Sequence, residues 1–361
     1  MDIERLLRPI APTNTIRAFQ RLLLLWYRRH GRDLPWRHTR DPYAVLVSEF
    51  MLQQTQVATV IPYYERWLRR FPHFTALAAA SENDVLHSWQ GLGYYARARN
   101  LHATGKAVEE RYGGRFPRRI DQMRELPGIG KYTAHAIATF AFDQAVPIVE
   151  ANTTRALARI FDCRAPVDSS RGQEMLWKYA ASLVPSRSAR IYNSALMDLG
   201  ALVCLPRRPK CDHCPVKNSC RAKNPDALPV KKARPRLRQF TENHTLIFRR
   251  GRILLEQSSA RWRGMWTLPR DNGLSSPESF RGGQAVTPSL ARPMHISVFP
   301  FTHHRITLQI FSRRGRRITR RNQRWFAIGE LDSIPIPSPH RRAMVDLLSV
   351  KRATPKRRPQ S

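Results

Sequence analysis

Hydrophobic residues recur with a helical period over most of the first two-thirds of the chain. Between Thr15 and His30 apolar side chains fall every three or four positions, and Gly31 follows as a helix stop. Asp41 followed by Pro42 is typical of an N-cap and first helical position, and predicts a helix that continues through Glu49. Further helices are predicted near residues 75–88, 95–112, 119–125, 131–142, 152–161, 172–184 and 190–202.

The pattern changes after a basic, proline-rich stretch at residues 225–239, which indicates a linker. Beyond it apolar and polar residues alternate as in strands, at residues 241–249, 253–257, 295–299, 305–311 and 323–328. The proline- and arginine-rich end, residues 351–361, is predicted to be a disordered tail. We therefore predict a mainly α region over residues 1–224 and a smaller α+β domain over residues 240–350.

The length and the charge of the chain indicate how many domains it has and what kind of partner it binds. A chain of 361 residues favours two domains, and 62 Lys plus Arg against 27 Asp plus Glu leave a net charge of +35. Such an excess favours a polyanionic partner, since neutralised phosphates release counterions. Residues 1–11 do not resemble a signal peptide, and the apolar stretch 22–27 is too short for a membrane span. We expect an intracellular protein without a membrane partner.

Four of the five cysteines form the pattern C-x6-C-x2-C-x5-C directly after a predicted helix, at Cys204, Cys211, Cys214 and Cys220. Four thiolates in one short loop can hold a metal centre, either tetrahedral zinc or an iron–sulfur cluster. The wide, uneven spacing and the single C-x2-C unit favour the iron–sulfur cluster. Cys163 stands outside the pattern and is expected to be a small core residue.

A glycine turn separates two predicted helices in the sequence Leu126-Pro-Gly-Ile-Gly. Gly128 and Gly130 permit a tight turn with positive φ, and the helix that follows directs free N–H groups outward. A helix N-terminus beneath such a turn is a phosphate-binding site. The turn therefore predicts a binding site for the phosphates of a nucleic-acid backbone.

The glycine turn and the cysteine loop together resemble the helix–hairpin–helix, or endonuclease III, superfamily of DNA glycosylases. Within it, Ser48-Glu-Phe-Met-Leu-Gln-Gln-Thr-Gln-Val and Gly91-Leu-Gly-Tyr-Tyr-Ala-Arg-Ala-Arg-Asn are similar to the MutY-type adenine DNA glycosylases. The resemblance covers roughly residues 20–225 and continues more weakly beyond them. It implies a helical glycosylase domain with a 4Fe–4S cluster as cofactor, and a monomer that acts on double-stranded DNA in a bacterial cytoplasm, associated with the nucleoid.

Removing a base from DNA requires flipping it out, and then two carboxyl groups for the glycosidic bond. Glu49 lies between apolar neighbours, where a carboxyl is costly unless it is paired or functional, although a surface position is an alternative. The resemblance makes Glu49 the acid that protonates adenine at N7. It makes Glu150, with Asn152, the group that stabilises the sugar cation. The family has Asp where this chain has Glu150, and a helix cap is the alternative role for Glu150.

The resemblance also implies roles for residues around the base. Superfamily members that cut the strand carry a Schiff-base Lys where this chain has Tyr132, so we predict a monofunctional enzyme. Gln53 and Tyr94 match residues inserted into the DNA stack, and Trp36 with Arg37 match the lining of the adenine pocket. Core packing is the alternative for the two aromatic residues.

The second domain contains Trp262-Arg-Gly-Met-Trp-Thr-Leu-Pro, which resembles an element of Nudix-like domains. Residues 270–295 offer only Asp271 and Glu278, so the acidic metal-binding helix of a Nudix hydrolase is missing. The resemblance implies a domain that recognises 8-oxoguanine through Phe301, Thr302 and His303, where Thr302 replaces the family's Ser. Arginines crowd residues 313–324 and are expected either to follow the DNA backbone or to protect a sheet edge.

We therefore expect an adenine DNA glycosylase of base excision repair, specific for adenine opposite 8-oxoguanine or guanine. The alternatives are a glycosylase for mismatched thymine or uracil, and a non-catalytic iron–sulfur protein that binds DNA. A nucleotide pyrophosphatase is disfavoured, because the acidic helix is missing.

Overall fold

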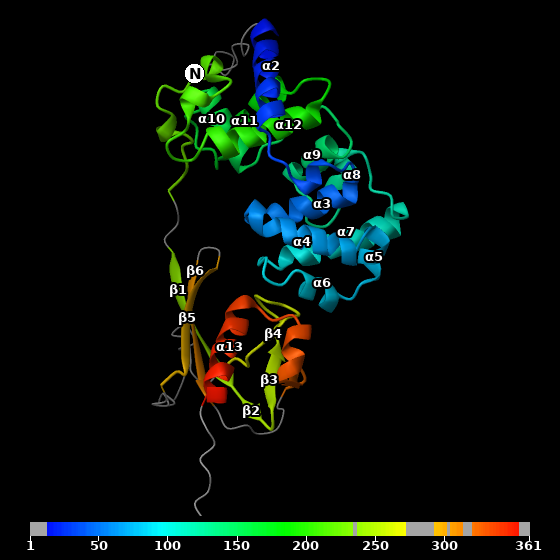
Figure 1. The fold of residues 1–361 in the computed structure, drawn as a ribbon, viewed down its shortest axis with the longest axis vertical. Helices are drawn as coiled ribbons and strands as arrows, with labels where there is room; N and C mark the ends of the chain where they lie inside the picture. The colour runs from blue at the N-terminus through cyan, green and yellow to red at the C-terminus, as the bar shows by residue number, and fades with distance from the viewer. Residues whose placement is uncertain (1–12, 234–236, 272–291, 302–303, 313–319, 354–361) are drawn as a thin grey trace, which may run out of the picture. The chain divides into compact units, whose positions relative to one another are not determined.

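The computed structural model describes residues 13–233, 237–271, 292–301, 304–312 and 320–353, which form two compact units (Figure 1). One unit comprises residues 1–79 and 103–233, and the other comprises residues 80–102 and 234–361. The domain limits and the disordered tail inferred from the sequence stay predictions, and residues 354–361 of that tail lie outside the described residues.

The first unit is helical, as predicted. Its helices are α2 (Thr13–His30), α3 (Pro42–Leu52), α4 (Val57–Arg70), α5 (Phe74–Ala79), most of α7 (Ala96–Tyr112), α8 (Ile120–Arg124), α9 (Lys131–Phe140), α10 (Ala151–Ile160), α11 (Ser170–Leu183) and α12 (Ala189–Asp198). Helix α3 packs against α4 and α9, and α12 packs against α2, α9 and α10. One core cluster joins Leu23 of α2, Leu157 of α10, Leu176 of α11 and Tyr192 of α12. This packing brings segments from both halves of the unit against α12.

Two helix predictions differ from the structure. The single helix expected at 75–88 is two, α5 and α6 (Glu82–Ser88), because Ser81 caps α6 by accepting from the Asp84 N–H at 3.1 Å. Helix α4 was not predicted, and it contains Pro62, which disfavours a helix interior. Its apolar residues Val60, Tyr64 and Trp67 nevertheless lie on one buried face.

The second unit contains α6, the start of α7 and two small sheets. Its strands are β1 (Arg238–Leu246), β2 (Phe248–Arg249), β3 (Arg252–Gln257), β4 (Trp266–Thr267), β5 (His295–Phe301), β6 (His304–Ser312) and β7 (Gln323–Ala327). In the first sheet, β6 lies between β1, which is parallel to it, and β5, which is antiparallel. In the second sheet, β3 pairs with β2, β4 and β7.

Four of the predicted strands are present, within a few residues at their ends, and the fold is α+β as expected. The single strand predicted at residues 241–249 is instead two, β1 and β2, which belong to different sheets. Alternate residues of β6, Ile306, Leu308 and Ile310, are fully buried. The C-terminal helix α13 (Ser338–Ala353) contacts β5 and was not predicted. Among the described residues, no helix combines the length and the apolar character that a membrane crossing requires.

Candidate functional site

Glu49 lies on α3, a helix whose residues from Tyr43 to Met51 are all buried. Asp41 caps this helix by accepting from the N–H groups of Tyr43 and Ala44, and Pro42 follows at the first helical position. Only 5% of Glu49 is exposed. Burial raises the pKa of the Glu49 carboxyl to about 7, an effect that Tyr132 opposes by hydrogen bonding and that Glu150 reinforces by its charge.

Tyr132 is the second residue of α9 and its side chain is hydrogen-bonded to Glu49. Burial, and then the two carboxyl groups, raise the pKa of Tyr132 well above its usual value. The phenol therefore stays protonated and donates to Glu49. Lys131, which precedes it, is exposed and lies with its ammonium group 3.9 Å from the centre of the Trp177 ring.

Glu150 is the N-cap of α10, so the capping role considered from the sequence is present. Its Oε1 accepts from the Thr153 N–H and its Oε2 from the Asn152 N–H, each at 2.8 Å. The Thr153 hydroxyl accepts in turn from the Glu150 N–H, which completes a capping box. Burial raises the pKa of Glu150 despite these two backbone donors. The cap fixes the direction of the carboxyl without excluding a chemical role.

One cavity of about 650 Å³ brings these residues together. Seven of the predicted site residues line it: Trp36, Arg37, Glu49, Gln53, Tyr132, Glu150 and Asn152. They come from four separate segments of the first unit, so only the tertiary fold assembles them. Trp36 is buried in a short helical turn, and its ring meets Tyr64 edge-on at 5.5 Å between centroids.

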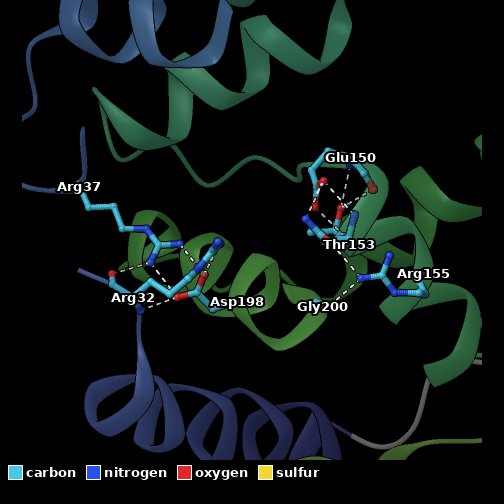
Figure 2. Close-up of polar contacts among 8 residues, drawn as sticks. Arg32, Arg37, Glu150, Thr153, Arg155, Asp198 and Gly200 are labelled. Carbon is cyan, nitrogen blue, oxygen red and sulfur yellow. Dashed lines mark hydrogen bonds and ion pairs between the residues drawn. The ribbon is translucent and has the colours of Figure 1, made fainter. Parts of the chain in front are cut away.

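The sequence analysis missed two charged residues beside this cavity, Arg32 and Asp198. Asp198 is fully buried at the end of α12 and accepts from Arg37 Nη1 and Nη2 at 2.7 and 2.8 Å and from Arg32 Nε at 2.7 Å. Figure 2 shows both guanidinium groups converging on its carboxylate. The signal that identifies Asp198 is the one used for Glu49, a carboxyl among apolar neighbours of a helix.

Arg155 links the Glu150 cap to the cysteine loop. Its Nη2 donates to Asn152 Oδ1 at 2.9 Å and to the Gly200 carbonyl at 2.6 Å, as Figure 2 shows. Its Nε donates to the Cys204 carbonyl at 2.7 Å. The side chain that holds Asn152 therefore also holds the first residue of the cysteine loop.

The glycine turn precedes α9, as predicted, but its two glycines differ. Gly128 has a φ of 74°, in the left-handed region that favours glycine. Gly130 is the N-cap of α9 with a φ of −84°, so the prediction of a positive φ at this position is wrong. A Cβ added to Gly130 would meet no atom within 4 Å. Neither backbone geometry nor packing within the chain requires glycine at position 130.

Cys204, Cys211, Cys214 and Cys220 are free thiols, and electrostatic interactions connect Cys214 with the other three. Arg159 donates to Cys204 Sγ at 3.3 Å. In the part of the chain that the structure describes, no three His, Cys, Asp or Glu side chains close around a single metal ion. Four thiols in one short loop are the ligands that an iron–sulfur cluster requires. Cys163 is buried in the core, as predicted.

Tyr94 and Phe301 belong to the second unit. Tyr94 is 43% exposed and has a φ of 48°, and the Arg97 guanidinium lies 5.3 Å from the centre of its ring. Phe301 ends β5. Thr302 and His303, which the sequence analysis singled out, lie outside the described residues, as do Arg313, Arg314, Arg316 and Arg317.

Three family patterns match the chain. Residues 47–181 match the HhH-GPD superfamily of base excision DNA repair proteins, and residues 243–345 match the NUDIX domain. Residues 204–220 match the iron–sulfur binding domain of endonuclease III. The cysteine loop is thus an iron–sulfur loop, and the cofactor of this chain is a 4Fe–4S cluster.

Known proteins extend this likeness. A solved structure of a thermostable thymine-DNA glycosylase superposes with a TM-score of 0.53 at 31% identity, over 58% of this chain and 96% of that one. The adenine DNA glycosylase of Rattus norvegicus is 45% identical over 61% of this chain, which spans only 45% of the rat protein. The chain therefore spans less than half the length of this relative.

The adenine DNA glycosylase of Buchnera aphidicola subsp. Schizaphis graminum matches over a larger share. It is 35% identical over 261 residues, which cover 71% of this chain and 75% of the relative. Its alignment thus extends beyond the HhH-GPD match. With this identity across three quarters of a curated relative, the chain belongs to the family of adenine DNA glycosylases.

Proposed function

We propose that this chain is a monofunctional adenine DNA glycosylase that acts as a monomer in base excision repair. Its substrate is adenine mispaired with 8-oxoguanine or guanine in double-stranded DNA. The observation that carries the proposal is the buried Glu49 carboxyl, hydrogen-bonded to Tyr132 and lining one cavity with Glu150. Proton donation and cation stabilisation need two carboxyl groups, and this pair lines one cavity.

Glu49 supplies the proton. With a pKa of about 7 it is about half protonated at neutral pH and largely protonated below it, and it faces a cavity that admits a flipped base. Its proton moves to N7 of adenine while the bond between N9 and C1′ breaks and both electrons leave with the base. The Glu49 carboxylate then accepts a proton from the water that adds to C1′.

Glu150 faces the developing sugar cation. The two backbone N–H groups that it caps hold its carboxylate in place, and Asn152 Nδ2 donates to Glu150 Oε2 at 3.3 Å. Glu carries one methylene more than the Asp of the family, and a displacement of about 1 Å costs on the order of 100-fold in rate. The capping box supports the assignment, because it anchors the longer side chain at both oxygens.

Tyr132 supports a reaction that ends at the abasic site. A phenol held protonated beside Glu49 offers no amine for a Schiff base with the sugar. Lys131 is the adjacent amine, but its ammonium group lies over the Trp177 ring and Lys131 does not line the cavity.

The remaining residues bind the DNA and the base. The open space at Gly130 admits a backbone phosphate close to the N-terminus of α9, beside the turn at Gly128. Trp36 and Arg37 line the adenine pocket, while Gln53 and Tyr94 insert into the stack. In the second unit, Phe301, Thr302 and His303 contact the base opposite adenine.

Cys204, Cys211, Cys214 and Cys220 are the residues that would hold the 4Fe–4S cluster. Bound by these four thiolates, the cluster would cross-link the loop, as structural metal centres do in small irregular segments. Arg155 and Arg159 then tie the loop to α10 through the Cys204 carbonyl and thiolate.

The test is single-turnover excision from three duplexes, with adenine opposite 8-oxoguanine, adenine opposite guanine, and thymine opposite guanine. We expect abasic product from both adenine duplexes, faster opposite 8-oxoguanine, and a large loss in Glu49→Gln. Excision of thymine alone would instead support a thymine glycosylase, in keeping with the structural likeness to such an enzyme. Binding without any abasic product would identify a non-catalytic DNA-binding protein.

The monofunctional assignment has its own test. We expect intact strands until alkali is added, and no covalent adduct after borohydride treatment. Strand breaks before alkali, together with a trapped adduct, would contradict the assignment to Tyr132.

A further inference from the structure

The side chain of Arg261 lies between two aromatic rings in the second unit. Its guanidinium carbon is 4.6 Å from the centre of the Phe301 ring and 5.4 Å from the centre of the Trp262 ring. Both distances lie within the range of cation–π attraction, which reaches about 6 Å. Trp262 is itself buried and packs against Phe299 and His340, so the position of its ring is fixed by the core. Arg261 thus contacts both this buried ring and Phe301, the last residue of β5.

Glu242 of β1 fixes the position of Arg261. Glu242 Oε2 accepts from Arg261 Nη1 at 3.1 Å, and the side chains of Glu242 and Arg261 are only 11% and 23% exposed. A partly buried ion pair is less screened by solvent than one on the surface. Arg270 also pairs with Glu242, at 3.6 Å, but its side chain is 56% exposed.

Phe301 is one flank of the segment that we propose recognises the base opposite adenine. It pairs with His304, the first residue of β6. His304 meets the Phe240 ring edge-on at 4.8 Å between centroids. Phe240 and Glu242 both lie on β1. Strand β1 therefore holds His304 directly through Phe240, and it holds Phe301 through Glu242 and Arg261.

We infer that Arg261 is a positioning residue that sets the preference for 8-oxoguanine over guanine. The inference rests on the proposed function of the segment between Phe301 and His304. Recognition of 8-oxoguanine depends on groups placed to within a fraction of an ångström, and both strand ends must be held for that. Arginine suits the position because its planar guanidinium contacts rings on two sides while its N–H groups bind a carboxylate.

The experiment compares the single-turnover rate of adenine excision opposite 8-oxoguanine with the rate opposite guanine. In Arg261→Met, which retains length and apolar character, we expect the ratio of the two rates to fall roughly tenfold, the loss of a desolvated cation–π contact. The fall comes from the 8-oxoguanine duplex, with the rate opposite guanine nearly unchanged. Arg270→Met is the matched control, since it removes the other cation on Glu242, and we expect its ratio to equal that of the parent chain.

Arg261→Lys keeps the positive charge and tests whether the effect on the ratio comes from the position of the recognition segment or from a loss of folding. We expect it to unfold at the temperature of the parent chain and to recover part of the ratio. An unchanged ratio in Arg261→Met, or equal losses on both duplexes, would overturn the inference while leaving the proposed function intact. No adenine excision by the parent chain would instead overturn the proposed function.

Discussion

Glu49 owes its chemistry to burial. Its pKa of about 7 follows from desolvation, and the Tyr132 hydroxyl opposes that shift only in part. The protonated form is the active one, so the excision rate is expected to be level below about pH 7. Above pH 7 the rate falls, by about tenfold per pH unit once most Glu49 is ionised. A pH profile of the single-turnover rate measures this, and a rate that rises through pH 7 and stays high would contradict it.

A second prediction concerns a variant in which residue 49 has no acidic proton. Glu49→Gln keeps the shape of the side chain and its hydrogen-bonding capacity but has no proton to donate. We expect excision to fall by about 100-fold or more, while binding of the mismatched duplex is kept. Single-turnover kinetics and a binding titration on the same preparation distinguish loss of chemistry from loss of fold.

Glu150 caps α10 and is also the carboxyl that we propose stabilises the sugar cation, and two substitutions separate these roles. Glu150→Asp restores the side chain of the family and can still cap α10, so we expect excision equal to or faster than in the parent chain. Glu150→Ala loses the cap, at about 1 kcal/mol of unfolding free energy, and loses excision as well. Denaturant unfolding and single-turnover rates report the two effects independently. A fully active Glu150→Ala would leave Glu150 as a cap alone.

At the scale of elements, the two glycines before α9 lead to different predictions. Gly130→Ala meets no atom of the described residues, so its stability cost is limited to the preference of an N-cap for Gly over Ala, below about 1 kcal/mol, whereas affinity for DNA falls because the methyl group occupies the proposed phosphate site. Gly128→Ala is strained at its φ of 74° and should lose about 1 kcal/mol or more of stability. Gly329→Ala, also in open space, is the control for affinity. Unchanged affinity in Gly130→Ala would contradict the assigned phosphate site.

The junction of α12 with the segment after α2 depends on one carboxylate. Asp198 neutralises Arg32 and Arg37 where it is fully buried, so Asp198→Asn leaves both cations without their counter-charge. We expect a loss of about 3 kcal/mol in unfolding free energy, typical of a broken buried pair. Glu174→Gln breaks an exposed pair with Lys178 and should cost less than about 0.5 kcal/mol. Equal denaturation midpoints for the two variants would count against this assignment.

At the scale of the whole molecule, the net positive charge is expected to determine how affinity for DNA depends on salt. If the chain binds DNA as proposed, its net charge of +35 implies extensive counterion release. With about 6–10 phosphate contacts, affinity for duplex DNA should fall by roughly 10³–10⁵ between 50 and 200 mM salt. Titrations at several salt concentrations, with matched and mismatched duplexes, give the slope. A slope near zero would exclude the backbone contact assigned to the glycine turn.

The sequence by itself determined what depends on neighbouring residues. Helical periodicity, the Asp41–Pro42 start of α3 and the spacing of the four cysteines are local features, and the structure retains each of them. The resemblance of short motifs also identified Glu49, Tyr132 and Glu150, which line one cavity together. The predictions of local structure held because capping and periodicity act over a few residues, whereas the roles of these three residues stay predictions.

Only the tertiary structure decided the properties that arise between distant segments. Local patterns missed helix α13 and the pairing of Asp198 with Arg32, which lie 166 residues apart. The positive φ expected at Gly130 was wrong, because that residue serves as an N-cap in extended conformation. The pKa of Glu49 likewise follows from its burial in the folded chain. Desolvation and long-range pairing depend on which surfaces close over a residue, and no local pattern contains that information.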